Sequence, residues 1–335
     1  MQEDNFSYIL RLTIQPGHQE KNRILQLASF CKEAKIDEVM FFINSDELCQ
    51  GHLSIDETQP WIDTILRAGD ILKPMGIRIS VNPWTTILHY DKGRKLKDWQ
   101  RFDLMVDPFG NQAGAQVCPL CNEWRVYLAE MYAYIASIKP YMMWVEDDLR
   151  FHNHAPLVWG GCFCDKHMAE YSTRIGKKVS REEFVQGLLK PGKPHPYRKV
   201  WLETCSESIA EIAKMLGKAV HNVAPDTLLG LMSSIPAVHC AEGRDWEAVL
   251  RGLACGNIMV NRPHLPAYTD VTPQNYLWNF NKISRTTRAV IPQEALIYPE
   301  LEHFPYTAFS KSKEFTRFQL ETSLAINSQG MQEKL

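Results

Sequence analysis

Short apolar runs alternate with helical stretches along nearly the whole chain, and this alternation limits the folds that the sequence can adopt. Seven runs have the length and composition of strands: Tyr8–Ile14, Ile36–Asn44, Ile77–Val81, Tyr141–Val145, Thr227–Met232, Asn257–Val260 and Ala295–Tyr298. Helical stretches follow them: His18–Ala34, Thr58–Met75, Glu123–Ile138, Val200–Val223, Trp246–Ala254, Asn275–Val290 and Lys313–Ile326. Repeated β–α units of this spacing predict an α/β fold with a parallel sheet and helical crossovers.

A (β/α)8 TIM barrel accounts for these units best. No Gly-x-Gly-x-x-Gly turn follows the first strand, so a dinucleotide-binding fold lacks its signature. We expect one barrel domain over residues 1–335, with a long insertion at about residues 150–198 after the fourth strand. The eighth strand is the difficulty, because only a short polar segment follows Ile326. Either Gly330–Leu335 begins that strand, or the chain stops before the barrel closes. We favour a C-terminally incomplete barrel without later domains, whose first and seventh strands would have open edges.

The composition excludes several classes of protein. The formal net charge of −2 argues against nucleic acid or an anionic membrane as the main partner. No segment has the apolar length of a membrane span, and the acidic N-terminus does not resemble a signal peptide. Nine cysteines without a secretory leader indicate reduced thiols or metal ligands rather than a disulfide framework. We therefore expect a cytoplasmic enzyme.

Three adjacent carboxylates, Glu146, Asp147 and Asp148, follow the apolar run that forms the fourth predicted strand. Side chains alternate across a strand, so Glu146 and Asp148 should point to one side and Asp147 to the other. In a barrel, active sites lie at the carboxyl ends of the strands. The alternative is a solvated acidic loop.

Polar residues also occur in or after the other predicted strands, and in a barrel all these strand ends meet at one face. They are Arg11, Asn44, Asn82, Trp84, Asn261, Arg262, Glu300 and Glu302. Glutamates after the fourth and seventh strands would then face each other, unless Glu300 and Glu302 are surface residues of a loop. Glycoside hydrolysis needs two such carboxyl groups, one protonated and one ionised. Asparagine and tryptophan side chains at neighbouring strand ends suit sugar hydroxyls and ring faces.

The chain resembles the clan A retaining glycoside hydrolases over most of Tyr8–Ile326. Three segments, Trp144–Arg150, Gly161–Cys164 and Pro299–Tyr306, look most like the family 42 β-galactosidases and the related family 164 β-mannosidases. The resemblance implies an exo-β-glycosidase that acts on oligosaccharides or other glycosides. It implies Glu146 as the acid/base and Glu300 as the nucleophile, with Glu302 as the substitute nucleophile. Family 42 relatives are often trimers through a later domain, so a homo-oligomer stays open.

One position departs from the clan pattern. Many clan A members have asparagine immediately before the acid/base, where it contacts the sugar 2-hydroxyl, whereas this chain has Val145. The contact would then come from Asp147, Asp148 or Asn82. This difference favours a divergent branch rather than family 42 proper.

Five residues in two loops could hold a zinc ion: Cys118, Cys121, Cys162, Cys164 and His167. Thiolates and imidazole are the ligands of structural zinc sites. Some family 42 enzymes have a structural zinc in the corresponding loops, with a fourth cysteine where this chain has His167. The spacing leaves open which thiol of the first pair binds, and reduced cysteines in a packed loop remain the alternative. Such an ion would pin the loop, and catalysis would need no cofactor.

Two other functions remain open. A metal-dependent barrel hydrolase would use Asp147, Asp148, His152 and His154, although we favour substrate contact or loop chemistry for the two histidines. A non-catalytic sugar-binding barrel would retain the fold without turnover. The identity of the sugar is not readable from the sequence.

Overall fold

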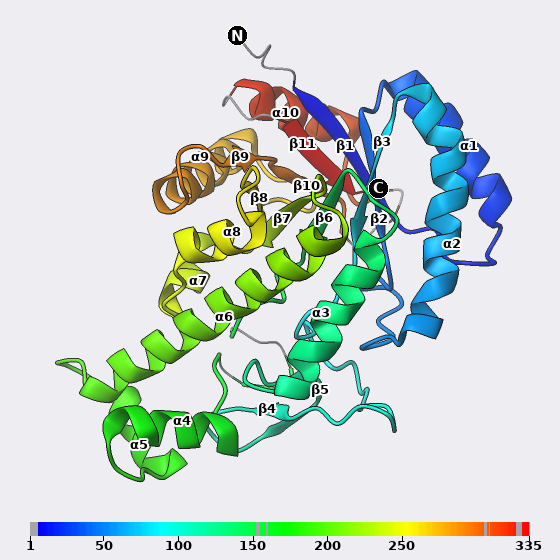
Figure 1. Ribbon diagram of the computed structural model, residues 1–335. Helices are drawn as coiled ribbons and strands as arrows, with labels where there is room; N and C mark the ends of the chain where they lie inside the picture. Colours follow the sequence, from blue (N-terminus) through cyan, green and yellow to red (C-terminus); the bar gives the residue numbers. More distant parts are fainter. Residues whose placement is uncertain are drawn as a thin grey trace.

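The computed structural model describes residues 6–151, 155–158, 160–304, 307 and 309–325, and the backbone of residues 330–334. Its main sheet has the strand order β10-β11-β1-β2-β3-β6-β7-β8-β9, and every neighbouring pair in it is parallel. β9 (Leu296–Ile297) and β10 (Glu300–Glu302) are two parts of one barrel strand, interrupted at Tyr298 and Pro299. The two ends of the strand order therefore belong to the same strand, and the sheet forms a barrel (Figure 1).

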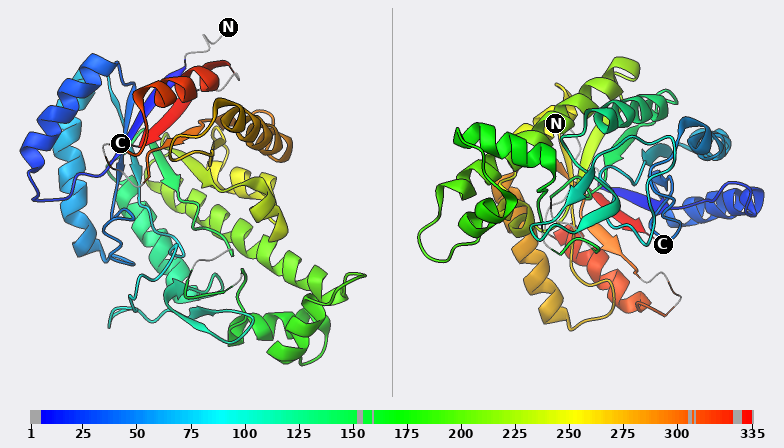
Figure 2. Two further views of the ribbon diagram at one scale, coloured as in Figure 1. Left: turned by 180° about the vertical axis from the view of Figure 1, so that it is seen from behind. Right: turned by 90° about the horizontal axis from the view of Figure 1, so that it is seen from below.

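Helices cover the outside of this barrel (Figure 2). The other barrel strands are β1 (Ser7–Leu12), β2 (Glu38–Phe42), β3 (Arg78–Asn82), β6 (Met142–Val145), β7 (Leu228–Ser233), β8 (Val260–Pro263) and β11 (Gly330–Lys334). The connecting helices are α1 (Glu20–Ala34), α2 (Ile55–Leu72) with η1 (Lys73–Met75), α3 (Asn122–Ala136), α6 (Pro196–Val223), α8 (Trp246–Ala254), α9 (Pro273–Val290) and α10 (Lys313–Ala325). The predicted (β/α)8 architecture is confirmed.

The eighth strand corresponds to the first of the two alternatives considered above. β11 pairs with β1 on one side and β10 on the other, so the first and seventh strands have no open edge there. β11 thus takes the place of the eighth strand, where we had expected the chain to stop before the barrel closes.

The barrel interior is a packed core. Ile9, Met40, Met142, Trp144, Met232, Val260 and Tyr298 form a buried cluster contributed by strands around the barrel. Trp144 is fully buried and fills the space beside Gly230, where an added Cβ would lie 2.7 Å from the indole ring. Since Met142 and Trp144 point inward, the alternation along the strand also directs Glu146 inward.

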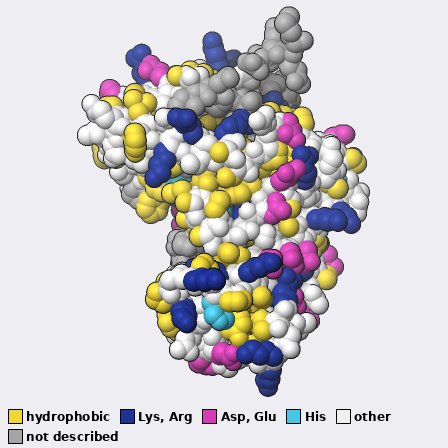
Figure 3. Space-filling model, turned by 90° about the vertical axis from the view of Figure 1, so that its left-hand side faces the viewer, with side chains coloured by type: hydrophobic (Ala, Val, Ile, Leu, Met, Phe, Trp, Pro, Cys, Tyr) yellow, Lys and Arg dark blue, Asp and Glu magenta, His cyan; other side chains and the backbone are white. Residues whose placement is uncertain are grey.

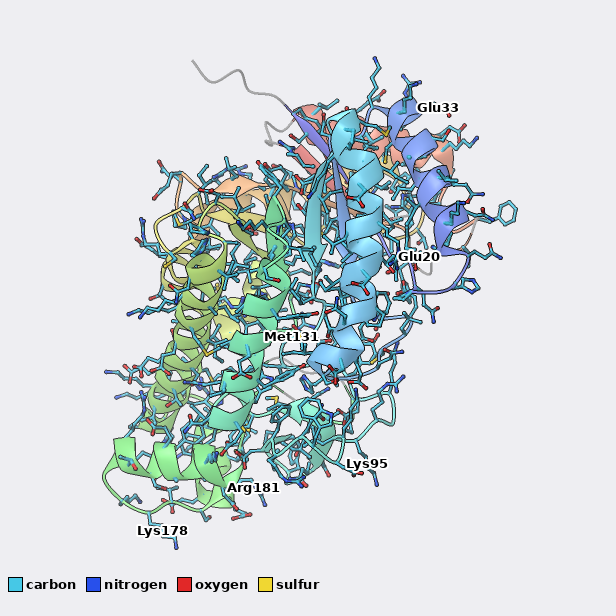
Figure 4. The ribbon with its side chains drawn as sticks, turned by 45° about the vertical axis from the view of Figure 1, so that its right-hand side comes forward. Glu20, Glu33, Lys95, Met131, Lys178 and Arg181 are labelled. Carbon is cyan, nitrogen blue, oxygen red and sulfur yellow. The ribbon has the colours of Figure 1, made fainter. Side chains whose placement is uncertain are left out.

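A much larger hydrophobic core lies between the sheet and the helices. Figure 4 labels Glu20 at the start of α1 and Met131 in α3. Glu20 pairs with Arg67 of α2, and Met131 accepts a hydrogen bond from Thr58 of α2. α2 begins at a capping box, in which the Ser54 and Glu57 side chains satisfy each other's backbone N–H groups.

Three insertions extend the carboxyl-end side of the barrel. A hairpin of β4 (Leu104–Val106) and β5 (Gln112–Val117) follows β3, α4 (Asp165–Ile175) and α5 (Arg181–Leu188) follow β6, and α7 (Pro236–Ala241) follows β7. The predicted insertion at about residues 150–198 is thus partly helical, and it has an aromatic core of its own. Tyr171 and Phe184 stack at 4.4 Å between ring centroids, and Phe184 stacks on Tyr197 at 5.3 Å. Together with the hairpin it forms the lower part of the molecule in Figure 1.

The surface agrees with the near-neutral net charge. On the face shown in Figure 3, basic side chains are interspersed with acidic and hydrophobic ones, without an extended patch of one charge sign. Among the described residues, no helix is both long and apolar enough to cross a membrane. All nine cysteines lie in the described part of the chain, and none forms a disulfide.

Candidate active site

Glu146 lies directly after β6 and is 2% exposed. Its Oε2 accepts a hydrogen bond of 2.6 Å from Nδ2 of Asn82, the last residue of β3. Its Oε1 lies 3.2 Å from Nη2 of Arg262 in β8. The sequence predicted Asn82 and Arg262 as strand-end residues of the site, and the fold brings both of them to Glu146.

Glu300, in β10, lies on the opposite side of the same guanidinium. Its Oε2 is 3.2 Å from Nη1 of Arg262 and 3.2 Å from Nδ1 of His264, and its Oε1 is 2.6 Å from Nη2 of Arg11. Burial alone would raise the pKa of Glu300, but Arg262, Arg11 and His264 together hold it well below its ordinary value. Glu300 is therefore a carboxylate that stays ionised at neutral pH.

Glu302 shares the cation of Glu300. Two residues apart on one strand, both side chains reach Nη2 of Arg11, with Glu302 Oε2 at 2.6 Å. Arg262 contacts both Glu300 and Glu146, whereas the Glu302 carboxylate pairs with Arg11. Glu300 is thus the glutamate of β10 that shares a guanidinium with Glu146.

The other two acids of the triplet have different surroundings. Asp147 accepts hydrogen bonds from His89 Nε2 at 2.5 Å and Ser234 Oγ at 2.6 Å, and it pairs with Arg150 at 3.1 Å. Burial would raise the pKa of Asp147, but Arg150 and His89 lower it well below the ordinary value.

Asp148 instead holds the loop after β3. It accepts hydrogen bonds from the backbone N–H groups of Thr86 and Leu88, both at 2.8 Å, and from the Thr86 hydroxyl at 2.5 Å. Burial raises its pKa in spite of these contacts. Asp148 does not line the cavity of the site.

A cavity of about 470 Å³ opens over the carboxylates. This volume is within the range of small-molecule sites, roughly 300–1,000 Å³. Its walls contain the predicted residues Arg11, Trp84, Glu146, Asp147, Arg262, Glu300 and Glu302. Aromatic and charged side chains therefore surround the two glutamates.

Like Asp148, the predicted residues Asn44, Asn82 and Asn261 do not line the cavity. Asn44 accepts from the backbone N–H of Gln50 and donates to the carbonyl of Gly51, so it closes the loop after β2. Asn261 donates to the carbonyl of Leu231 and the hydroxyl of Ser233 and so joins β8 to β7. His152 and His154 lie outside the described residues.

The sequence did not single out several residues that line the cavity, namely Asp46, His89, Tyr90, Arg150, Ser234, Ile235, Val238, His264, Tyr268 and Phe304. His264 stands two residues after Arg262, and the strand alternation that places Arg262 in the site could have identified it. His89 and Tyr268 lie in loops without a pattern that would indicate their contacts.

Four of the five predicted metal ligands converge. The ligand atoms of Cys118, Cys162, Cys164 and His167 all lie within 4.8 Å of one another, and all four residues are buried. Cys118 Sγ lies 3.5 Å from Cys164 Sγ and 3.2 Å from Nδ1 of His167. A tetrahedral zinc ion with normal bond lengths keeps sulfur and nitrogen ligands about 3.5–3.8 Å apart. The donor set and its spacing thus fit zinc.

Cys121 lies apart from this cluster. Its thiol groups instead with Asp103 and Glu123, and it accepts the backbone N–H of Asp103 at 3.2 Å. The structure therefore distinguishes the two thiols of the Cys118-Pro-Leu-Cys121 segment, which the spacing could not.

Comparisons with known proteins support the fold. No model of a known protein family matches the sequence, and no curated protein is similar to it in sequence. Among solved structures, the β-amylase catalytic domain from Paenibacillus polymyxa matches 98% of this chain and 92% of its own length, with a TM-score of 0.65 and 13% identity. The PgaB (BpsB) glycoside hydrolase domain from Bordetella bronchiseptica matches 98% and 93%, with a TM-score of 0.63 and 10% identity.

A β-galactosidase from the psychrophilic Marinomonas ef1 is also similar. It matches 97% of this chain with a TM-score of 0.66 and 12% identity, and this chain spans 53% of it. The chain thus has the barrel fold of glycoside hydrolases, including family 42 β-galactosidases. At these identities the similarity concerns the fold, and the chemistry has to be argued from the residues.

Proposed function

We propose that this protein is a retaining glycoside hydrolase of the exo-β-glycosidase type, with Glu146 as acid/base and Glu300 as nucleophile. The observation that carries the proposal is the placement of these two glutamates. Glu146 follows the fourth strand of the barrel, and Glu300 lies in the seventh strand. The same Arg262 guanidinium contacts both glutamates. A retaining enzyme needs two carboxyl groups about 5 Å apart across the scissile bond. The fold of the chain, shared with glycoside hydrolases, agrees with this chemistry.

The charges around the site support the division of roles. Arg11 and Arg262 are buried, and they balance the charges of two buried carboxylates, Glu300 and Glu302. Arg150 similarly pairs with Asp147. Arg262 contacts both glutamates, whereas Glu300 also contacts Arg11 and His264. The glutamate with more cationic partners suits the nucleophile, which must be ionised, and Glu146 is then the general acid.

The proposed reaction has two steps. Glu300 attacks the anomeric carbon while Glu146 gives its proton to the departing glycosidic oxygen, which forms a glycosyl ester on Glu300. Glu146, now ionised, takes a proton from water, and the resulting hydroxyl oxygen attacks the anomeric carbon and releases Glu300. Arg11, Arg262 and His264 keep Glu300 ionised and oriented for both steps.

We also propose that Cys118, Cys162, Cys164 and His167 hold a structural zinc ion. The ion would join the loop that precedes α3 to the loop that precedes α4. None of the four residues lines the cavity, so the bond-breaking steps would proceed through the glutamates alone.

A panel of nitrophenyl glycosides tests the proposed activity and identifies the sugar. With the substrate that is turned over, Glu146→Gln and Glu300→Ala should each reduce kcat by at least ~10³-fold. Azide should restore activity to Glu300→Ala with inversion at the anomeric carbon, whereas the first product of the wild type should keep its configuration by NMR. Glu294→Ala, at an exposed glutamate, is the matched control.

Glu302→Ala separates the two glutamates of β10. Full activity in both Glu300→Ala and Glu302→Ala would refute the proposal, and a first product of inverted configuration in the wild type would refute the retaining mechanism. Azide rescue of Glu302→Ala, without rescue of Glu300→Ala, would identify Glu302 as the nucleophile.

A metal-dependent hydrolase is the second candidate, because His89, Glu146 and Asp147 offer ligand atoms within 4.8 Å of one another. Arg150 and Arg262 contact the same two carboxylates, and this positive charge opposes a bound cation. Loss of activity with a chelator, restored by a divalent metal in a protein that stays folded throughout, would favour this candidate.

A further inference from the structure

The side chains that line the cavity fall into two groups by their contacts, one near each proposed catalytic glutamate, and we call these the Glu300 half and the Glu146 half of the cavity. Arg11, His264 and Glu302 lie on the Glu300 side. His89 and Trp84 lie on the Glu146 side, because a ring nitrogen of His89 is within 4.8 Å of a carboxylate oxygen of Glu146 and Trp84 stacks on His89. Asn82 donates to Glu146 and accepts the backbone N–H of Trp84 at 2.7 Å, and His89 donates to Asp147, the residue after Glu146.

Trp84 is held in an unusual conformation. Its φ of 64° lies in the left-handed region, which is uncommon for a bulky residue and is typically retained only where the surroundings impose it. His89 stacks on the indole with 5.2 Å between ring centroids and 22° between ring planes, and Phe42 packs edge-on against it at 5.3 Å. The hydrogen bond to Asn82 fixes its backbone. Trp84 is therefore a pre-positioned aromatic side chain in the cavity wall.

Polar groups of fixed position stand next to this aromatic pair. His89 and Arg150 both contact the Asp147 carboxylate, and Ser234 contacts both Asp147 and Arg150. Charged partners keep Asp147 ionised, so it is a strong hydrogen-bond acceptor that lines the cavity. A rigid aromatic wall beside fixed hydrogen-bonding groups is the combination that binds an apolar ring face edged with hydroxyls.

We infer that the Glu146 half of the cavity is a binding subsite for a leaving group that is itself a sugar, with Trp84 and His89 as its aromatic wall and Asp147 as a hydroxyl acceptor. The inference rests on the proposed function, in which Glu146 gives its proton to the leaving-group oxygen and the leaving group therefore lies on the Glu146 side. The natural substrate class is then a disaccharide or a longer oligosaccharide.

The same subsite would bind an acceptor sugar in the second step. A hydroxyl of the bound sugar would give its proton to Glu146 as its oxygen forms a bond to the anomeric carbon, and the ester bond to Glu300 would break. The product is a new glycoside, and no co-reactant besides the acceptor is needed. Binding at this subsite can therefore be measured in two reactions, cleavage of a glycoside and transfer of the sugar to an acceptor.

The test compares two substrates that carry the same sugar in the Glu300 half: the glycosyl fluoride, which has no leaving-group ring, and the disaccharide. Trp84→Ala should lower kcat/KM for the disaccharide at least ~10-fold more than for the fluoride, since aromatic contacts of this kind contribute on the order of a tenfold effect. Trp84→Phe should recover part of the difference. Trp278→Ala, at a 73% exposed tryptophan of α9, is the matched control and should change neither value.

A second measurement uses acceptor sugars with the glycosyl fluoride. In the wild type, added sugar should give a transfer product, and in Trp84→Ala the yield should fall at the same acceptor concentration. Equal losses on both substrates with unchanged transfer would overturn the inference, as would wild-type turnover of the fluoride with no disaccharide cleaved and no acceptor used. If the wild type cleaves neither substrate class, the proposed function itself fails.

Discussion

The proposed zinc site allows a sharp prediction, because the structure separates two cysteines that are three positions apart. Cys118 belongs to the cluster with Cys162, Cys164 and His167, whereas Cys121 does not, and both thiols are fully buried. Cys118→Ser should therefore abolish zinc binding, and Cys121→Ser should leave one zinc ion per chain. Burial and loop position are matched between the two substitutions.

The size of the effect follows from binding linkage. An ion present at about a thousand times its dissociation constant stabilises the folded state by about 4 kcal/mol. Unfolding entropy of about 2.1 cal/mol/K per residue, taken over 335 residues, makes each kcal/mol worth about 1.4 °C in Tm. Loss of the zinc ion should thus lower Tm by about 6 °C. Cys121→Ser should cost at most about 1–2 °C, because the shorter side chain weakens the contact with the Asp103 backbone N–H, and a single buried hydrogen bond contributes about 1 kcal/mol.

The assay is thermal unfolding with and without a chelator, combined with metal analysis of the purified protein. The wild type and Cys121→Ser should both lose about 6 °C on chelation, while Cys118→Ser should begin at the lower Tm and not respond. The reasoning is refuted if Cys118→Ser retains one zinc ion and the chelator response, or if wild-type protein purified with added zinc contains none.

Three further substitutions have defined outcomes. Arg262 is the strongest of the groups that lower the pKa of Glu300, so Arg262→Gln should raise that pKa and move the acidic limb of the kcat/KM profile to higher pH; an unchanged limb would contradict the assignment of Glu300. Burial raises the pKa of Glu38 to about 7, although Ser80 and Arg78 contact it. In the folded protein Glu38 therefore keeps a proton that it releases in the unfolded chain near its ordinary pKa. The contribution of Glu38 to the free energy of unfolding is complete below that ordinary pKa and is lost as the pH rises through about 7. Because glutamine does not titrate, the unfolding free energy of Glu38→Gln should depend less on pH than that of the wild type, by up to about 3 kcal/mol over this range. Asp148→Ala should leave two buried N–H groups without an acceptor and cost about 2–5 kcal/mol in denaturant unfolding, and a cost below about 1 kcal/mol would mean that water replaces the carboxylate.

The sequence pattern predicted the elements in which local periodicity and burial agree. The predicted helix at Trp246–Ala254 has the bounds of α8, where an amphipathic sequence packs on the barrel and Asp245 caps the first turn. The strand predicted at Asn257–Val260 lies instead at Val260–Pro263. This strand carries Asn261 and Arg262 into the barrel mouth, and such polar residues do not show the apolar run from which a buried strand is recognised.

The insertions could not be read from composition. β5 has the sequence Gln-Ala-Gly-Ala-Gln-Val, which is poor in strand-forming residues. Its backbone is fixed by a distant carboxylate, since Asp91 accepts hydrogen bonds from the N–H groups of Gly114, Ala115 and Gln116. A strand that depends on a side chain more than twenty residues away leaves no local pattern, and the same applies to the helices within the long insertion, which pack mainly on α6.

The acidic triplet shows how far sequence reasoning can reach into the site. Alternation along β6 correctly directs Glu146 toward the barrel interior. The predicted arrangement of strand ends brings Arg262 to Glu146 over a separation of 116 residues and to Glu300 over 38 residues. Alternation could not separate Glu146 from Asp148, since both were expected on one side. The chain turns after Val145, so Asp148 reaches the backbone of the β3 loop while Asp147 takes its place in the cavity wall. The loop after β3 also contains Trp84. Asp148 therefore positions the aromatic wall of the cavity, beside which Glu146 and Asp147 would act.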